Sequence, residues 1–394
     1  MIEREITPIL RTLFEKNPVV TVTGPRQSGK TTLCRAVFRN LAYFNLEQPD
    51  SREFAIEDPR GFLKACDGGA VIDEIQRAPE LVSFIQATVD ETHRNGQFVL
   101  TGNRQFRVVE AVSQSLAGRT ALLRLLPFSI QEALEARKTV EVARLIHNGF
   151  YPRIFDQDLD PAIALGDYFE TYVERDVRQV SEIRNLSAFQ KFVRLCAGRV
   201  GQLLNLHSLG NDAGVSHTTA RQWISILEAS YIVFLLQPFH ANISKRLVKS
   251  PKLYFYDVGL ASYLLGIEHA RQVATHPLKG FLFENMVVVE ALKHRFNRGR
   301  RSNLSFYRDS SGTEVDLVYS LADRFLAVEI KAGETVNRSF FSNLRKLRGY
   351  LPEQIAGEIL VHGAETEMVR DDVHITGAVG FVGALADLER EVLG

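Results

Sequence analysis

The sequence predicts an α/β protein in which a parallel sheet comes first, helices and a winged helix follow, and a second α/β domain comes last. Three observations lead to this fold class. Strand-like and helix-like segments alternate between residues 19 and 101, helices and a hairpin follow at residues 203–265, and strands with alternating carboxylates lie beyond residue 312. Strands that alternate with helices are typical of parallel sheets with crossover helices. A chain of 394 residues predicts several domains, which we place at residues 1–130, 131–200, 201–270 and 275–394.

Composition and charge limit the classes of function. The 47 basic and 47 acidic residues cancel, and 45% of the residues are hydrophobic, which is typical of a globular protein in water. Any attraction to nucleic acid must therefore come from local patches. The chain shows no signal-peptide pattern, no apolar run near the roughly 20 residues of a membrane helix, and no metal-ligand spacing of cysteines. We expect a cytoplasmic protein with no membrane contact.

The elements of the first domain follow from the spacing of apolar residues. An amphipathic helix is expected at residues 1–16 and another helix from Lys30 onward. The other expected helices are Arg60–Cys66 and Glu80–Arg94. The expected strands are Val19–Thr23, Tyr43–Leu46, Ala70–Ile72 and Gln97–Thr101.

A glycine-rich loop joins the first strand to the helix that begins at Lys30. Residues 24–31, GPRQSGKT, match the pattern GxxxxGK[ST] in full. Such a loop turns its backbone N–H groups toward phosphates at a helix amino terminus, where Lys30 contacts the β and γ phosphates and Thr31 ligates Mg²⁺. The ligands expected here are ATP and Mg²⁺. The residues expected to bind them are Gly24, Pro25, Arg26, Gln27, Ser28, Gly29, Lys30, Thr31 and Thr32.

Polar residues follow the later strands of this domain. Asp73 and Glu74 end the strand at residues 70–72, which suits Asp73 for holding Mg²⁺ and Glu74 for polarising the attacking water. The next strand ends near Thr101 and Asn103. Its position resembles sensor 1 of AAA-type ATPases, for which we choose Asn103 and keep Thr101 as the alternative. Arg119, between a helix and a strand, suits either an arginine finger acting on a neighbouring subunit or an ordinary surface turn.

The middle of the chain has the order of a winged helix. Helices dominate residues 131–200, a turn at residues 210–214 follows a short helix, and Ser216 can cap a second helix that runs to Ala229. Strand-like runs at Tyr231–Leu236 and Leu253–Tyr256 form the expected hairpin. DNA contact and protein docking both remain open. The residues expected to face a partner are His217, Thr218, Arg221, Gln222 and Ser225 on the helix and Lys245, Arg246, Lys249 and Lys252 on the wing.

The last region combines a helix at Gly280–Phe296 with three strands at Leu304–Tyr307, Glu314–Tyr319 and Phe325–Ile330. Because side chains alternate along strands, pairing of the last two strands would bring Asp316 to Glu329 and Lys331. Paired carboxylates can hold a divalent metal. Glu284 lies within an apolar helical stripe, where a carboxylate needs a partner. The predicted metal ligands are Glu284, Asp316 and Glu329, with Lys331 positioning a water; the alternative is a hairpin with surface Glu–Lys pairs.

Two resemblances follow from these motifs. The set Glu284, Asp316, Glu329 and Lys331 resembles the metal site of the PD-(D/E)XK nuclease superfamily. Over essentially the full length, the chain resembles a prokaryotic family of AAA-type P-loop ATPases with a carboxy-terminal PD-(D/E)XK-like domain. The segments that carry this likeness are TGPRQSGKTTL, AVIDEIQ, FVLTGN, LPFS, YVERDV, KLYFYDVGL, LFEN and GTEVDLV followed by AVEIKAG. The family implies ATP, Mg²⁺ and assembly into homo-oligomers; its relatives often carry serine where this chain has Asn103.

Three functions are compatible with the sequence. The first is an ATPase whose nucleotide cycle controls a DNA-binding or metal-dependent nuclease-like module. The second is an ATP-dependent scaffold or signalling switch whose nuclease-like fold is catalytically idle and binds protein partners. The third is an ATPase that acts on another protein without nucleic acid. The first is the leading hypothesis.

Overall fold

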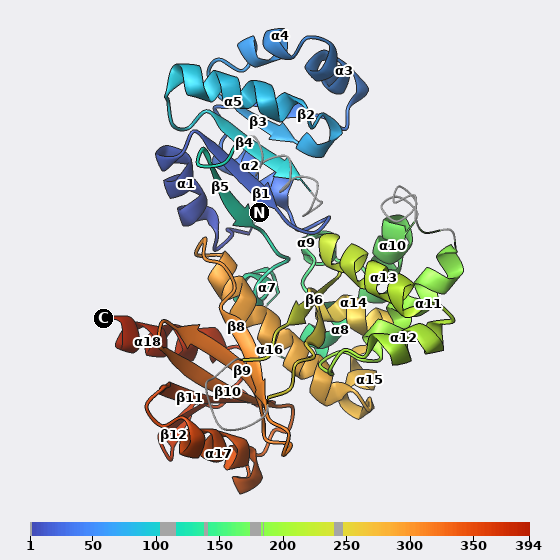
Figure 1. The fold of residues 1–394 in the computed structure, drawn as a ribbon, viewed down its shortest axis with the longest axis vertical. Coiled ribbons are helices and arrows are strands. Elements are labelled where there is room, and N and C mark those ends of the chain that lie inside the picture. The colour runs from blue at the N-terminus through green and yellow to red at the C-terminus, as the bar shows by residue number, and fades with distance from the viewer. Residues whose placement is uncertain (1, 103–115, 138–140, 174–182, 184, 240–246) are drawn as a thin grey trace. The chain divides into compact units, whose positions relative to one another are not determined.

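The computed structural model describes residues 2–102, 116–137, 141–173, 183, 185–239 and 247–394, and the chain forms two compact units (Figure 1). Unit 1 consists of Met1–Phe128, Ala229–Tyr231 and Arg295–Arg301, and unit 2 of Ser129–Glu228, Ile232–His294 and Ser302–Gly394. None of the helices that lie in these described ranges combines the length and the apolar character needed to cross a membrane.

Unit 1 contains a five-stranded parallel sheet with the strand order β2-β3-β4-β1-β5. Its first strand consists of valine and threonine only, which are strong strand formers, and every residue of it is buried. The predicted parallel sheet is confirmed, and the predicted strand boundaries agree with the structure within about a residue. The strands are β1 (Val19–Thr23), β2 (Ala42–Asn45), β3 (Ala70–Asp73), β4 (Phe98–Gly102) and β5 (Thr120–Arg124).

Helices cover both faces of this sheet. Apolar residues of α1 and α2 pack with Val20, Val22 and Val71 on one face. Residues of α3, α4 and α5 pack with Val19 and Ile72 on the other. Because neighbouring residues of a strand point to opposite faces, the two cores share the same strands. The helices are α1 (Thr7–Lys16), α2 (Lys30–Val37), α3 (Pro49–Glu57), α4 (Pro59–Lys64) and α5 (Leu81–Thr92).

Unit 2 contains a six-stranded mixed sheet with the order β12-β13-β11-β10-β9-β8. Strands β8, β9 and β10 form an antiparallel meander, whereas β10, β11 and β13 are parallel. The predicted hairpin of the last region is therefore confirmed. The strands are β8 (Leu304–Arg308), β9 (Glu314–Leu321), β10 (Arg324–Lys331), β11 (Ile355–His362), β12 (Met368–Arg370) and β13 (Val373–Thr376).

Helices occupy most of the remainder of unit 2 (Figure 1). Helix α17 packs through Leu344 and Leu347 on the sheet face that carries Ala327. The helices are α7 (Ile130–Ala136), α8 (Val142–Asn148), α9 (Pro152–Asp156), α10 (Pro161–Tyr172), α11 (Leu186–Ala197), α12 (Leu206–Ala213), α13 (His217–Ala229), α14 (Val258–Leu264), α15 (Ala270–Thr275), α16 (Lys279–Phe296), α17 (Ser342–Tyr350) and α18 (Phe381–Leu393).

A two-stranded antiparallel sheet of β6 (Val233–Leu236) and β7 (Lys252–Phe255) follows α13. The chain beyond β6 is hydrogen bonded to the edge strand β8, since the Phe239 N–H donates to the Phe306 carbonyl at 2.7 Å. The Val248 N–H donates in the same way to the Arg308 carbonyl at 3.1 Å. The hairpin that the sequence assigns to a wing is therefore joined through its backbone to the carboxy-terminal sheet.

Candidate functional site

The glycine-rich loop between β1 and α2 has the backbone that phosphate binding requires. Gly24 has φ 152° and Gly29 has φ 92°, in the region that favours glycine. A Cβ at Gly24 would lie 2.0 Å from the Leu125 carbonyl oxygen. Ser28 Oγ is buried and has no hydrogen-bond partner within the described part of the chain. The loop therefore fits a phosphate, which offers an acceptor for this hydroxyl and for the N–H groups of the loop.

Lys30 begins α2 and bends back over the loop. Its ammonium group donates to the carbonyl oxygens of Gly24 at 3.1 Å and Pro25 at 2.7 Å. Burial lowers the pKa of Lys30 to about 8, although the charges of Glu74 and Asp73 act in the opposite direction. The ammonium group is thus held by weak neutral acceptors, which phosphate oxygens can replace.

Asp73 ends β3 and joins the glycine-rich loop to two neighbouring strands. The Thr31 hydroxyl donates to Asp73 Oδ2 at 2.7 Å, and the Tyr43 hydroxyl donates to the same oxygen at 2.9 Å. Thr101 of β4 donates to Asp73 Oδ1. A hydroxyl and a carboxylate at this distance are the protein ligands that Mg²⁺ takes beside nucleotide phosphates. Thr31 and Asp73 therefore fit the predicted Mg²⁺ site.

Glu74 directly follows Asp73 and has φ 60°, an uncommon conformation for a residue with a side chain. Its N–H donates to Thr101 Oγ1 at 3.4 Å, and its carboxylate accepts a hydrogen bond from Gln76. Burial raises the pKa of Glu74, while the charges of Lys30 and Arg26 oppose the rise. A raised pKa makes a carboxylate a stronger base, which suits proton transfer.

Arg4 is a site residue that sequence reasoning missed. Its buried guanidinium group donates to the Ser28 carbonyl and to the Leu126 carbonyl, both at 2.8 Å, and lies 4.9 Å from the ring centre of Phe128. Its hydrogen bonds thus connect the glycine-rich loop to the segment that follows β5. Arg4 precedes the first helix and belongs to no motif, so its role depends on a contact that only the folded chain reveals.

The structure supports the predicted sensor position, but it does not describe Asn103, and it pairs Arg119 within the same chain. Strand β4 lies between β3 and β1, which is the sheet position that a sensor requires. Thr101 contacts Asp73, whereas Asn103 lies outside the described residues. Arg119 pairs with Asp90 of α5 through two hydrogen bonds. A role on a neighbouring subunit would require Arg119 to leave this partner.

The lowered pKa of Lys30 predicts a pH dependence of nucleotide binding. Above pH 8 the nucleotide-free protein loses the Lys30 proton, and phosphates bind the ammonium form. Affinity for ATP should therefore fall by about tenfold per pH unit above pH 8, with proton uptake on binding. Calorimetric titrations in two buffers of different ionisation enthalpy measure that uptake directly. Constant affinity across this range with no proton uptake would contradict the assignment.

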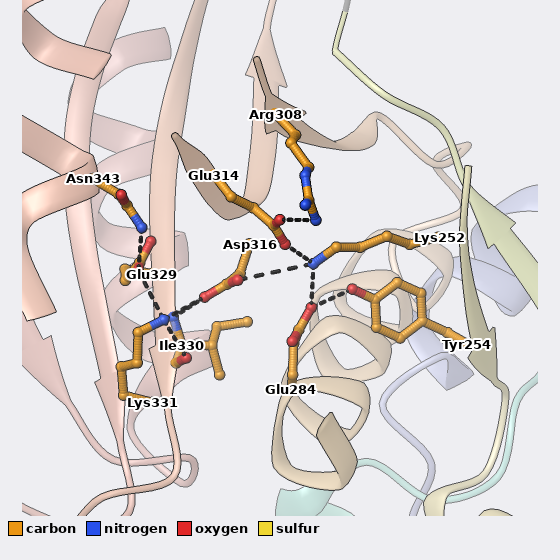
Figure 2. Close-up of polar contacts among 10 residues, drawn as sticks. All are labelled: Lys252, Tyr254, Glu284, Arg308, Glu314, Asp316, Glu329, Ile330, Lys331 and Asn343. Atoms are coloured by element: carbon orange, nitrogen blue, oxygen red, sulfur yellow. Dashed lines mark hydrogen bonds and ion pairs between the residues drawn. The ribbon is translucent and has the colours of Figure 1, made fainter. Parts of the chain in front are cut away.

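A second group of charged residues lies in unit 2, where β7, α16, β9 and β10 meet (Figure 2). The Lys252 ammonium group lies 2.8 Å from Glu284 Oε1, 2.5 Å from Glu314 Oε1 and 3.9 Å from Asp316 Oδ1. The group also contains a second lysine between two carboxylates. We use the name carboxylate–lysine cluster for six residues, namely Lys252, Glu284, Glu314, Asp316, Glu329 and Lys331.

The second lysine bridges the paired strands. Lys331 Nζ lies 3.1 Å from Asp316 Oδ2 and 2.7 Å from Glu329 Oε1, and the Ile330 N–H donates to Asp316 Oδ2 at 2.8 Å. The prediction that Asp316 meets Glu329 and Lys331 is confirmed. Asn343 of α17 donates to Glu329 Oε1 at 3.2 Å. Each of the two lysines thus lies between carboxylates that come from different elements.

Burial controls the titration of these carboxyl groups. It raises the pKa of Glu284 to about 7 against the opposing charge of Lys252, and it raises the pKa of Glu329 to about 8 with help from the charge of Asp316. The two lysines behave differently, because burial alone would lower their pKa values. The surrounding negative charges raise the pKa of Lys252 and of Lys331 instead.

The prediction that Glu284, Asp316 and Glu329 hold a divalent metal does not fit this arrangement. Glu284 Oε1 already accepts hydrogen bonds from Lys252 and from the Tyr254 hydroxyl, and a lysine lies between each neighbouring pair of the three carboxylates. Across the described ranges, no three histidine, cysteine, aspartate or glutamate residues gather closely enough for a metal ion. Glu329 Oε2, buried and unpartnered within those ranges, is the one feature of the cluster that favours a metal.

The predicted partner-facing residues of the middle region are only partly exposed. Ser216 caps α13 by accepting from the Thr219 N–H at 3.1 Å, as predicted, and the His217 ring stacks on that of His207 at 4.2 Å. The prediction that Lys252 lies on an exposed wing is wrong, because the residue is 1% exposed. Lys245 and Arg246 lie outside the described residues. The exposed members are Thr218, Arg221, Gln222, Ser225 and Lys249.

Sequence comparisons match the chain to three family profiles and to several curated proteins. An AAA domain matches residues 16–134, and domains of unknown function (DUF8612 and DUF4143) match residues 139–271 and 279–379. The Mycobacterium tuberculosis protein Rv2008c is 31% identical over 357 residues, which cover 88% of this chain and 78% of that protein. A Haemophilus influenzae protein is 21% identical over 347 residues, covering 79% of this chain and 82% of its own length.

Solved structures with some similarity include P-loop proteins. The Walker-type ATPase PABY2304 of Pyrococcus abyssi is 13% identical, covers 67% of this chain and 96% of its own, and gives a TM-score of 0.45. The RuvB Holliday junction branch migration motor of Thermotoga maritima is 16% identical, covers 59% of this chain and 89% of its own, and gives a TM-score of 0.33.

Proposed function

Because the chain belongs to the family of the mycobacterial protein Rv2008c and carries an AAA domain at residues 16–134, we propose that it hydrolyses ATP and transmits the nucleotide state to unit 2. The observation that carries the proposal is the contact between Thr31 of the glycine-rich loop and Asp73 of β3, at 2.7 Å. It brings the phosphate-binding and the magnesium-binding halves of an ATPase site together. The raised pKa of the adjacent Glu74 favours hydrolysis over binding alone.

Each residue of this site has a specific task in the proposed reaction. Lys30 exchanges its contacts with the loop carbonyls for oxygens of the β and γ phosphates. The Thr31 hydroxyl and the Asp73 carboxylate would hold Mg²⁺, which would neutralise charge on the phosphates. Glu74 accepts a proton from the water that attacks the γ phosphorus, while the bond from that phosphorus to the bridging oxygen breaks and ADP departs. Tyr43 fixes the orientation of Asp73 through its hydrogen bond.

The exposed side of α13 supports DNA as the partner of unit 2. Thr218, Arg221, Gln222 and Ser225 are exposed on this one helix, and such side chains contact phosphates and base edges. The helix follows α12 and precedes the β6–β7 hairpin, which is the order of a winged helix. We therefore propose that the nucleotide cycle controls binding of DNA through α13.

A second candidate function is a switch that binds a protein, with an idle nuclease-like fold in its carboxy-terminal part. The specific observation in its favour is the pair of lysines within the carboxylate–lysine cluster. Hydrolysis of DNA by a PD-(D/E)XK-type site would need metal-binding carboxylates, and here lysines already neutralise them. In this function α13 would bind a protein surface.

One experiment separates the two candidates. ATP turnover is measured with and without duplex DNA for the wild type, for Lys30→Ala and for Arg221→Glu. We expect Lys30→Ala to lose turnover by at least about 100-fold, and DNA to raise turnover of the wild type but not of Arg221→Glu. The matched control is Arg271→Glu, because Arg271 is also exposed but lies on α15. ATP turnover that requires Lys30 but is unchanged by DNA in every variant would favour the protein-binding switch.

A further inference from the structure

We infer that the ammonium group of Lys252 permanently occupies the cation position of the carboxylate–lysine cluster, so that the cluster is a metal-independent joint between β7 and the carboxy-terminal sheet. The inference concerns unit 2 alone and goes beyond the proposed ATPase function. It also predicts that removing this ammonium group opens a site for a divalent cation.

The Lys252 ammonium group lies among three of the carboxylates. Lys252 Nζ lies between Glu284 of α16 and the residues Glu314 and Asp316 of β9, at 2.8, 2.5 and 3.9 Å. Figure 2 shows it approaching these carboxylates from β7, on the side opposite to Lys331. A lysine has three N–H donors, and here two of them have carboxylate acceptors within hydrogen-bond distance. A cation that bridged these three carboxylates would have to lie where Nζ lies.

The buried strand β7 holds Lys252 in this position. Lys252 is 1% exposed, and all four residues of β7 are buried. Its backbone pairs with Leu236 of β6 and makes a bridge to Leu203, which fixes the strand on both sides. The ammonium group also lies 5.4 Å from the ring centre of Phe306. A divalent ion could enter only if a buried charge left its partners, which is costly.

The carboxylates of the cluster have cationic and hydrogen-bonding partners from this chain. Buried carboxylates need cations or hydrogen bonds, and the cluster supplies both from within the chain. Arg308 donates to Glu314 at 2.7 Å, and the Tyr254 hydroxyl donates to Glu284. Three cations, Lys252, Lys331 and Arg308, therefore lie against the four carboxylates, and Asn343 adds a hydrogen bond to Glu329. Although burial acts against the charged form, the negative charges keep the pKa of Lys252 well above its usual range, which favours the ammonium form.

A joint of this kind has a structural consequence. Lys252 belongs to the hairpin after the helix–turn–helix, whereas its partners Glu284 and Asp316 belong to α16 and β9. The ion pairs therefore connect the predicted winged-helix region to the carboxy-terminal sheet, next to the backbone bonds between residues 237–239 and β8. Movement of α13 would be transmitted through the same hairpin to the sheet.

The experiment measures Mn²⁺ binding in nucleotide-free protein by electron paramagnetic resonance and by thermal unfolding. All variants carry Asp73→Asn, which removes the magnesium ligand of unit 1, so the result does not depend on the ATPase proposal. We expect no Mn²⁺ binding in this background. In Lys252→Ala, a hundredfold excess of Mn²⁺ over its dissociation constant should raise the unfolding midpoint by about 5 to 10 °C. Adding Asp316→Asn should abolish that gain.

Two results would overturn the inference. One is Mn²⁺ binding by the protein with Lys252 intact that disappears with Asp316→Asn. The other is a folded Lys252→Ala variant that gains no Mn²⁺ binding. If Lys252→Ala does not fold, Lys252→Gln replaces it, because glutamine preserves hydrogen bonding without the charge. Mn²⁺ binding by the protein that keeps Lys252 is measured in either case, and binding that depends on Asp316 would overturn the inference by itself. Lys249→Ala is the matched control, because Lys249 is exposed three residues before β7 and should leave both measurements unchanged.

Discussion

Replacement of Glu74 by glutamine is expected to preserve ATP binding and to lower kcat by about 100- to 10,000-fold, the usual contribution of a general base. Glutamine has the same shape, so it can keep the left-handed backbone of this position (φ 60°) and the N–H bond to Thr101. It cannot accept a proton from water. The phosphate contacts of Lys30 and the Thr31–Asp73 pair remain in place, so binding should be retained.

The measurement compares nucleotide affinity by calorimetry with steady-state phosphate release. Asp73→Asn is the informative control, because Asp73 accepts hydrogen bonds from Thr31 and Tyr43 and should affect binding of Mg²⁺–ATP as well as turnover. A Glu74→Gln variant that turns over at nearly the wild-type rate would exclude Glu74 as the base. In that case Asp73 or another carboxylate would have to accept the proton.

The nucleotide site could be predicted from sequence because its parts are local. The loop, the strand before it and the helix after it are consecutive, and parallel strands place their carboxyl ends at one edge of the sheet. Helix α3 (Pro49–Glu57) was missed, since its apolar residues do not form a stripe: Phe54 and Ile56 are 40% and 58% exposed. Arg4 and Tyr43 were missed because they contact the site only through the folded chain.

The carboxylate–lysine cluster could be predicted only in part from local sequence patterns. Alternation along β9 and β10 was enough to predict that Asp316 meets Glu329 and Lys331. The need of Glu284 for a partner was also correctly predicted, but the partner is Lys252 rather than a metal. No spacing rule joins residues so far apart in sequence. A signal was present: β7 reads Lys-Leu-Tyr-Phe and is entirely buried, and a lysine in a buried strand requires an acidic partner.

Replacement of Lys252 by methionine is expected to lower the free energy of unfolding by about 3 to 5 kcal/mol, the usual effect of removing one partner of a buried ion pair. Methionine keeps much of the volume of the side chain, so the loss reports the missing charge. Glu284, Glu314 and Asp316 would be left buried with less positive charge nearby. Denaturant unfolding measures the difference, and Lys249→Met should stay within about 0.5 kcal/mol of the wild type.

The double variant Lys252→Met with Glu284→Gln separates lost charge from lost packing. The glutamine that replaces Glu284 is neutral and can still accept a hydrogen bond from the Tyr254 hydroxyl. The double variant should therefore be more stable than Lys252→Met alone, which is the coupling that a buried pair predicts.

The loss of stability caused by Lys252→Met should also depend on pH, because Glu284 titrates. Burial raises the pKa of Glu284, and the charge of Lys252 limits that rise to about 7; without this charge the pKa rises further, and the carboxyl group is neutralised by protonation as pH falls. The loss caused by Lys252→Met should therefore be largest well above pH 7 and should shrink as the pH falls toward 7, whereas a loss that is constant with pH would mean that packing, rather than charge, holds this joint together.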